Sequence, residues 1–190
     1  MNRYVVVSGL PAAGKSTVAN SIARCSSLPL FDKDELLESL FIDKKPRDAN
    51  ERRDLSRRAD ELLELAVRGS PQAIVVSWWK HPRSTATTGT PTDWLQNLPG
   101  QLVEIYCECS PETAADRFFR RQRHTGHLDA RWSYAELLFE LSAFALLGPL
   151  NVGDLVTVDT SQPLDVDAVW HQVDILSHGL DNRMRRTRDG

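Results

Sequence analysis

The segment at residues 9–16, GLPAAGKS, matches the pattern G-x-x-x-x-G-K-[S/T]. A strand-like run, residues 4–7 (YVVV), comes before it, and a helical pattern, residues 17–23 (TVANSIA), comes after it. Glycines at both ends let such a loop curl so that successive backbone N–H groups point inward, and the following helix adds its positive end. The pattern therefore predicts a strand, a loop and a helix that together bind a phosphate group.

The side chains of this segment suit ATP bound with Mg2+. In loops of this kind the lysine reaches the β- and γ-phosphates, and the hydroxyl that follows it binds the metal ion. Lys15 and Ser16 are the residues expected in these roles. We expect the nucleotide to contact the following residues: Gly9, Ala12, Ala13, Gly14, Lys15, Ser16 and Thr17.

Length and charge limit the remaining possibilities. A chain of 190 residues, of which 41% are hydrophobic and 26% charged, fits one globular domain. No apolar run approaches the roughly 18 residues of a membrane span, and the first strand-like run begins at Tyr4, so we expect a cytoplasmic protein without a signal peptide. The net charge of -3 gives no overall attraction to nucleic acid, and the basic residues 181–190 are expected to form a mobile tail.

Short runs rich in β-branched and apolar residues alternate with helical patterns along the chain. The strand-like runs are residues 4–7, 28–31, 73–77, 102–107 and 155–158. The longest helical pattern, residues 48–68, carries an apolar stripe and stops at Gly69. Because each connecting helix must pack back onto the strands, this alternation predicts a doubly wound α/β domain with a parallel sheet and helices on both faces.

Two absences and several further segments narrow the type of phosphate-loop protein. The sequence has no Asn-Lys-x-Asp guanine motif and no transporter-type signature. The phosphate loop, followed by FDKD at residues 31–34, resembles the small P-loop kinases, a family that includes chloramphenicol phosphotransferase, adenylylsulfate kinase, the zeta toxins and the polynucleotide 5'-kinases. Residues 106–112, 117–123 and 158–161 are similar to that family's fourth strand, arginine-bearing lid and final strand. The resemblance implies a five-stranded sheet of order 2-3-1-4-5, one kinase domain over residues 1–180 and a lid at about residues 117–132.

Two carboxylates follow the second strand, at the sheet edge where ligands bind in open α/β folds. A carboxylate near the γ-phosphate can accept the proton of an acceptor hydroxyl. The resemblance implies that Asp34 has this role and that Asp32 supports Mg2+ through water. The alternative is that Asp34 only caps the helix at residues 35–41.

An arginine cluster lies where the related kinases carry their lid. Arg117 and Arg121, four residues apart and hence on one side of a helix, are the candidates for stabilising the charge of the transition state. The alternative is an ordinary solvated helix face. Thr160 follows the last strand, where the relatives pass backbone over the adenine, although the same residues also suit a simple turn. His124 and His127 lack a third ligand at a recognisable spacing, so no zinc site is expected.

The end of the third strand departs from the common pattern. Many P-loop enzymes have an aspartate there that supports Mg2+, whereas this chain has Ser77. The aromatic and cationic segment at residues 78–83 (WWKHPR) follows on the same edge and is a candidate acceptor site, the alternative being that its tryptophans belong to the core. The Ser/Thr-rich residues 84–92 are expected to form a mobile surface loop.

These observations predict an ATP- and Mg2+-dependent phosphotransferase that acts on a hydroxyl of a small molecule. The first alternative is a nucleotide-binding regulatory module without catalysis or with weak hydrolysis, which the serine at position 77 favours. The second is a polynucleotide 5'-kinase, which the acidic charge balance disfavours. The protein is expected to be a monomer or a homodimer.

Overall fold

The computed structural model describes residues 2–186, with side chains described as far as Ser177. Its centre is a five-stranded sheet of order β2-β3-β1-β4-β5, in which every pair of neighbouring strands is parallel. The strands are β1 (Arg3–Gly9), β2 (Leu30–Asp32), β3 (Gln72–Val76), β4 (Gln101–Glu108) and β5 (Asp154–Asp159). The predicted doubly wound sheet and its strand order are therefore confirmed.

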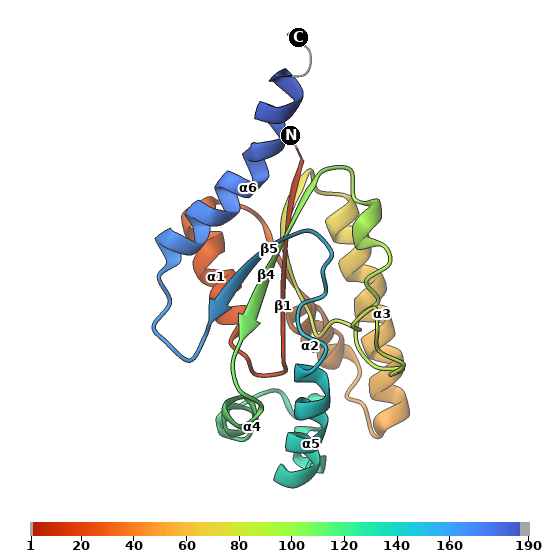
Figure 1. Ribbon diagram of the computed structural model, residues 1–190. Helices are drawn as coiled ribbons and strands as arrows, with labels where there is room; N and C mark the ends of the chain where they lie inside the picture. Colours follow the sequence, from red (N-terminus) through yellow and green to blue (C-terminus); the bar gives the residue numbers. More distant parts are fainter. Residues whose placement is uncertain (1, 187–190) are drawn as a thin grey trace.

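Helices cover both faces of this sheet, and two more lie beyond its carboxyl edge. They are α1 (Lys15–Ser26), α2 (Lys33–Asp43), α3 (Ala49–Arg68), α4 (Pro111–Arg120), α5 (Tyr134–Ala145) and α6 (Val166–Arg186), with short 3-10 turns η1 (Leu95–Asn97), η2 (Thr125–His127) and η3 (Asp129–Arg131). Figure 1 shows α1 beside α6 on one side of the sheet, α3 on the other, and α4 and α5 beyond the strand ends. Part of the predicted tail thus belongs to α6, and residues 187–190 lie outside the described residues.

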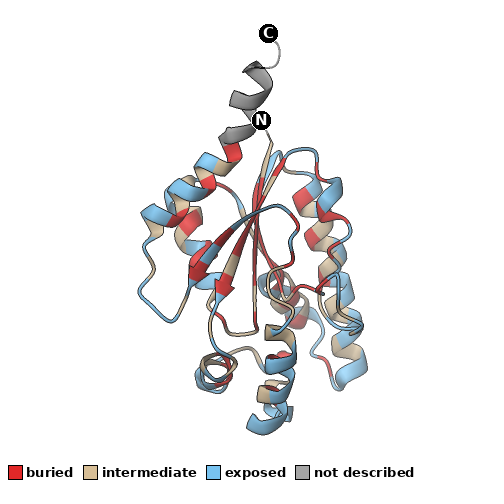
Figure 2. Cartoon of the chain, viewed as in Figure 1, coloured by how far each residue is buried: buried red, intermediate tan, exposed pale blue. Residues whose placement is uncertain are grey.

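The core consists of two layers because alternate strand residues point to opposite faces. Val5 and Val7 of β1 face α1 and α6, whereas Tyr4 and Val6 face α3. Buried positions follow the strands and the inner sides of these helices in Figure 2. With both faces covered, a ligand is expected at the carboxyl edge of the sheet.

Local sequence features set the helix ends near this edge. Ser110 accepts the backbone N–H of Thr113 and is followed by a proline in the first turn of α4. Ser133 and Glu136 form a capping box at the start of α5. None of the helices in the described part of the chain is long and apolar enough to cross a membrane.

Candidate active site

The phosphate loop joins β1 to α1 and depends on two glycines with positive φ. Gly9 has φ 130 and Gly14, the residue before α1, has φ 84. A Cβ atom on Gly9 would lie 2.4 Å from the backbone oxygen of Cys107 on β4. Only glycine fits both this conformation and this close approach, so the sheet packing itself requires the first glycine of the motif.

Lys15, the first residue of α1, folds back over the loop. Its Nζ donates hydrogen bonds to the carbonyl oxygens of Gly9, at 3.1 Å, and Leu10, at 2.7 Å. Burial lowers the pKa of Lys15 to about 8, against 10.5 for a free lysine, although nearby acidic groups such as Asp34 oppose this change. The ammonium group is therefore held where a bound polyphosphate would restore its full charge.

Ser16 and Asp32 connect the phosphate loop with the end of β2. The Ser16 hydroxyl donates to Oδ2 of Asp32 at 2.7 Å, and Oδ1 of Asp32 accepts the backbone N–H of Asp34 at 2.9 Å. Burial raises the pKa of the Asp32 carboxyl, and these two hydrogen bonds oppose the rise. A hydroxyl and a carboxylate are oxygen ligands of the kind that Mg2+ prefers. The pair therefore fits the expected metal site.

Asp34 does not cap a helix. The N-cap of α2 is Asp32, which leaves the side chain of Asp34 free to pair with Arg123. Burial acts to raise the pKa of Asp34, but the charges of Arg123 and His127 outweigh this effect and hold the pKa below its usual value. Asp34 is consequently ionised at neutral pH.

The segment after α4 places two arginines against one carboxylate. Arg121 and Arg123 lie 3.3 and 3.4 Å from Oδ2 of Asp129. The guanidinium carbon of Arg121 also lies 4.4 Å from the ring centre of Phe118, and its Nε is buried without a hydrogen-bond partner in the described part of the protein. Since α4 ends at Arg120, Arg121 stands beyond the helix rather than on its face as expected.

Arg117 has a different hydrogen-bond partner from Arg121. Its guanidinium donates to the backbone oxygen of Thr160 at 2.7 Å and lies 3.3 Å from the Thr160 hydroxyl. Thr160 in turn is hydrogen bonded to Glu108 at the end of β4, and its side chain lies nearest to the position a Cβ on Gly14 would occupy, at 3.7 Å. Arg117 thus fixes the turn after β5 beside the phosphate loop.

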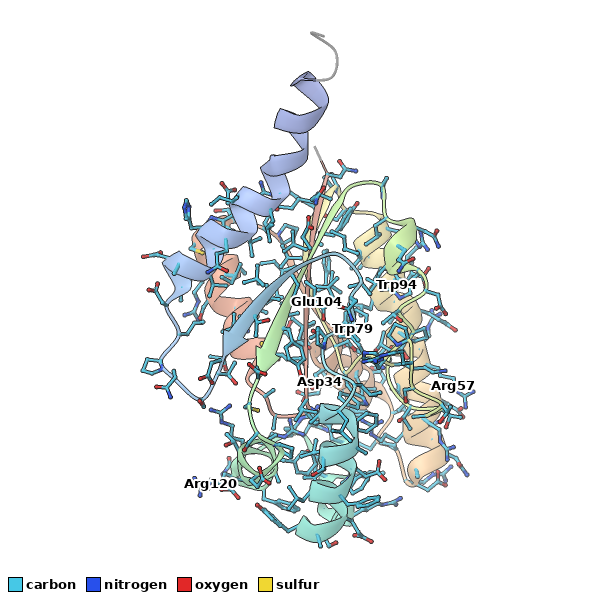
Figure 3. All side chains as sticks on the ribbon, viewed as in Figure 1. Asp34, Arg57, Trp79, Trp94, Glu104 and Arg120 are labelled. Atoms are coloured by element: carbon cyan, nitrogen blue, oxygen red, sulfur yellow. The ribbon has the colours of Figure 1, made fainter. Side chains whose placement is uncertain are left out.

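A single open cleft of about 1210 Å3 connects these groups. Figure 3 shows Asp34 near the strand ends, where 51% of its side chain is exposed, with Arg120 pointing away from it into solvent. Of the predicted site residues, the cleft is lined by Ala12, Gly14, Lys15, Ser16, Thr17, Asp32, Asp34, Arg117, Arg121 and Thr160. Gly9 and Ala13 do not line this cleft: Ala13 is fully buried, and Gly9 lines a smaller cavity instead. No cluster of three or more acidic, histidine or cysteine side chains suited to a metal ion occurs among the residues that the structure describes.

Comparisons with known proteins identify the family. The AAA_33 family model, described as an AAA domain, matches residues 5–134. The chain belongs to this family. No curated protein matches the sequence.

Solved structures similar to this AAA_33 member include kinases. A candidate kinase from Chloroflexus aurantiacus J-10-fl has 26% identity and a TM-score of 0.73, with 91% of this chain and 97% of that chain covered. A gluconokinase from Sinorhizobium meliloti 1021 has 18% identity and a TM-score of 0.56, covering 96% and 97%. A shikimate kinase from Bacteroides thetaiotaomicron has 16% identity and a TM-score of 0.54, covering 93% and 98%. The last two show the shared fold alone, and the expected resemblance to small P-loop kinases is confirmed.

The segment after β3 in this AAA_33 domain is buried and hydrogen bonded to a greater extent than the sequence indicates. Trp79 is buried and donates from Nε1 to the backbone oxygen of Val7 at 2.9 Å. Ser77 pairs with the hydroxyl of Thr90, which is fully buried, so residues 84–92 end in a fixed contact rather than an entirely mobile loop. Trp78 lines the cleft, with its ring centre 5.9 Å from Nζ of Lys15.

Two further positions of the AAA_33 domain were missed by sequence reasoning. Arg52 on α3 and Trp132 after η3 both line the cleft. Arg52 lies in a helix dense in charged residues, where nothing in the sequence separates it from its solvated neighbours. Only the packing of α3 beside α2 identifies it.

Proposed function

We propose that this protein is an ATP- and Mg2+-dependent kinase that transfers the γ-phosphoryl group to a hydroxyl of a small molecule. The observation that carries the proposal is that Asp34, ionised and not used as a helix cap, shares one cleft with the phosphate loop. A non-enzymatic phosphate site needs no such carboxylate. The kinase fold and the candidate kinase among its structural neighbours support the same conclusion.

The donor side of the proposed site uses the loop and the residues around Thr160. The loop amides and Lys15 would bind the β- and γ-phosphates, and Arg117 would hold the Thr160 turn against the nucleotide. Ser16 and Asp32 would hold Mg2+, which when bound neutralises charge on the phosphates. Arg121, whose Nε lacks a partner among the described residues, would bind oxygens of the transferred group.

The acceptor side uses Asp34. As the acceptor oxygen bonds to the γ-phosphorus and the bond from that phosphorus to the bridging oxygen of ADP breaks, the hydroxyl proton passes to the carboxylate. Arg123 pairs with Asp34 before the acceptor arrives, so binding of the acceptor must displace or share this contact. Most of the rate acceleration then comes from positioning and electrostatics.

The proposed unit is one cytoplasmic kinase domain over residues 1–180, with residues 117–132 as a lid. The segment from Arg117 to Asp129 already contributes side chains to the cleft from one side, as a lid requires. A second candidate is a regulatory nucleotide-binding module. The observation in its favour is that Ser77, at the position of the expected metal-supporting carboxylate, is bound to Thr90.

Labelled ATP separates the two candidates. The full chain is incubated with Mg2+ and labelled ATP, with and without pooled metabolites and antibiotics, beside Lys15→Ala, Asp34→Asn and the surface control Arg120→Gln. A kinase labels an acceptor, loses about 100-fold or more of this activity with Asp34→Asn, and keeps it with Arg120→Gln. Tight nucleotide binding without any labelled acceptor, and with Asp34→Asn behaving as wild type, would establish the regulatory module instead.

A further inference from the structure

The first turn of α3 supplies a positive charge to the cleft on the side of β2 and β3. Ala49, Arg52 and Arg53 line the cavity there, and α3 packs against α2 and both of these strands. Arg52 is half-buried, and its Nε donates to the backbone oxygen of His127 at 3.2 Å. Within the described residues no hydrogen bond or ion pair engages its terminal nitrogens, so they remain open to the cleft.

The charges around Arg52 do not balance. Arg123 is near enough to lower the pKa of Arg52 further after burial has lowered it, while Asp34 and Asp129 oppose the change. Both carboxylates are already paired with Arg123, and Asp129 also with Arg121. The guanidinium groups therefore outnumber the carboxylates, and the surplus positive charge lies where Arg52 faces the cavity. A partly desolvated, unpaired guanidinium favours an anionic partner.

Arg52 lies on the other side of the cleft from the groups proposed to bind ATP. The phosphate loop follows the central strand β1, and the groups proposed to lie beside the nucleotide, Arg117 and Thr160, belong to the β4 and β5 side. Arg52 and Asp34 belong to the opposite side, next to β2 and β3. The cleft of about 1210 Å3 exceeds the volume of a typical single-ligand pocket, which is roughly 300 to 1,000 Å3. It has room for a second ligand beside the nucleotide.

We infer that the acceptor carries an anionic oxygen group, a carboxylate or a phosphate, and that Arg52 binds this group while Asp34 receives the hydroxyl. The inference rests on the proposed kinase function and names the class of its substrate. A guanidinium presents paired N–H donors that match either anion. Arg52 is thus a specificity-determining residue of the acceptor subsite.

The test divides potential acceptors by charge. Labelled ATP, Mg2+ and the full chain are incubated with three pools: anionic compounds (sugar acids, hydroxy acids, sugar phosphates and nucleotides), neutral compounds (sugars, polyols and nucleosides) and cationic aminoglycosides. The anionic pool is also tested as separate carboxylate and phosphate halves. We expect label in the anionic pool, and the halves identify which anion Arg52 accepts.

The variants assign the preference to Arg52. With the labelled compound, Arg52→Gln should raise KM about 10- to 100-fold with kcat changed far less, and Arg52→Lys should recover part of the loss. Arg57→Gln is the matched control, because Arg57 lies on the same helix with 71% of its side chain exposed. ATP affinity and the melting temperature of each variant should equal those of the wild type, which excludes misfolding as the cause.

Each outcome decides the inference. Label confined to the neutral or cationic pool, or an anionic acceptor whose KM is unchanged in Arg52→Gln, overturns it and leaves the kinase function standing. Absence of label from every pool overturns the kinase function, and the inference with it. Label in the anionic pool with a KM effect confined to the Arg52 variants establishes it.

Discussion

Asp34 and Arg123, 89 positions apart in the sequence, form an ion pair that joins the start of α2 to the segment after α4. The same guanidinium reaches Asp129 with its other terminal nitrogen. Arg123 therefore holds the Asp34 carboxylate and the proposed lid together. The pair keeps Asp34 ionised and also occupies it.

Replacing Arg123 with glutamine should raise the pKa of Asp34, because Arg123 is the main charge that lowers it. The acid limb of the plot of kcat/KM against pH should therefore move to higher pH in the variant. The pair also stabilises the fold above the unfolded pKa of Asp34, and this contribution is lost as the pH falls through the lowered folded pKa. Arg120→Gln, which changes an exposed arginine of α4, serves as the control. An acid limb that stays in place in Arg123→Gln would show that Asp34 is not the group being titrated.

Glycine at position 9 is a requirement of packing as well as of phosphate binding. Gly9→Ala places a Cβ atom 2.4 Å from the backbone oxygen of Cys107 at a φ of 130. We expect the variant to lose roughly 3 kcal/mol or more of unfolding free energy, or not to fold. Gly148→Ala is the matched control, because its φ is 67 but no atom lies within 4 Å of the added Cβ. It should cost only about 1 to 2 kcal/mol, the ordinary price of a left-handed residue. Equal losses in urea unfolding would contradict the packing explanation.

Lys15 should give the protein without nucleotide an unusual dependence of stability on pH. Its folded pKa is about 8 against 10.5 when free, so between these values the unfolded chain binds more protons than the folded one. The unfolding free energy contributed by this group therefore rises with pH through this range. Urea titrations of wild type and Lys15→Met should show the steeper rise in the wild type. Parallel curves for the two proteins would mean that the lysine is not desolvated in the loop.

The fold, and the phosphate-loop part of the candidate site, were predictable from the sequence because they depend on local patterns. The glycines and Lys15 form one contiguous motif, and the strand order follows from the family resemblance that the motif supports. The sequence did not decide whether Asp32 or Asp34 caps α2, because either aspartate could occupy the N-cap position. Arg52 could not be identified, since its role depends on how α3 packs beside α2.

Local sequence patterns also fail to identify residues that hold distant segments together. Trp79 was a candidate for acceptor contact, but its indole N–H is hydrogen bonded to Val7 in the core. The sequence does not reveal that contact because it joins residues 72 positions apart. Glu104 was not identified at all. It lies in the middle of β4, fully buried, at a position where the strand pattern predicts an apolar side chain.

Glu104, labelled in Figure 3, should contribute strongly to stability because its buried carboxylate accepts several hydrogen bonds. Its oxygens accept the Ser8 hydroxyl at 2.5 Å and the backbone N–H groups of Leu150 and Asn151, both at 2.8 Å. Glu104→Gln keeps the size but turns an N–H2 group toward these donors, so at least one is left without an acceptor. We expect a loss of about 1 to 3 kcal/mol in the free energy of unfolding, measured in urea. Glu108→Gln, at the exposed end of the same strand, should change it by less than about 0.5 kcal/mol. Because Ser8 immediately precedes Gly9, the Glu104 variant should also bind ATP more weakly, whereas a loss confined to stability would separate this carboxylate from the phosphate loop.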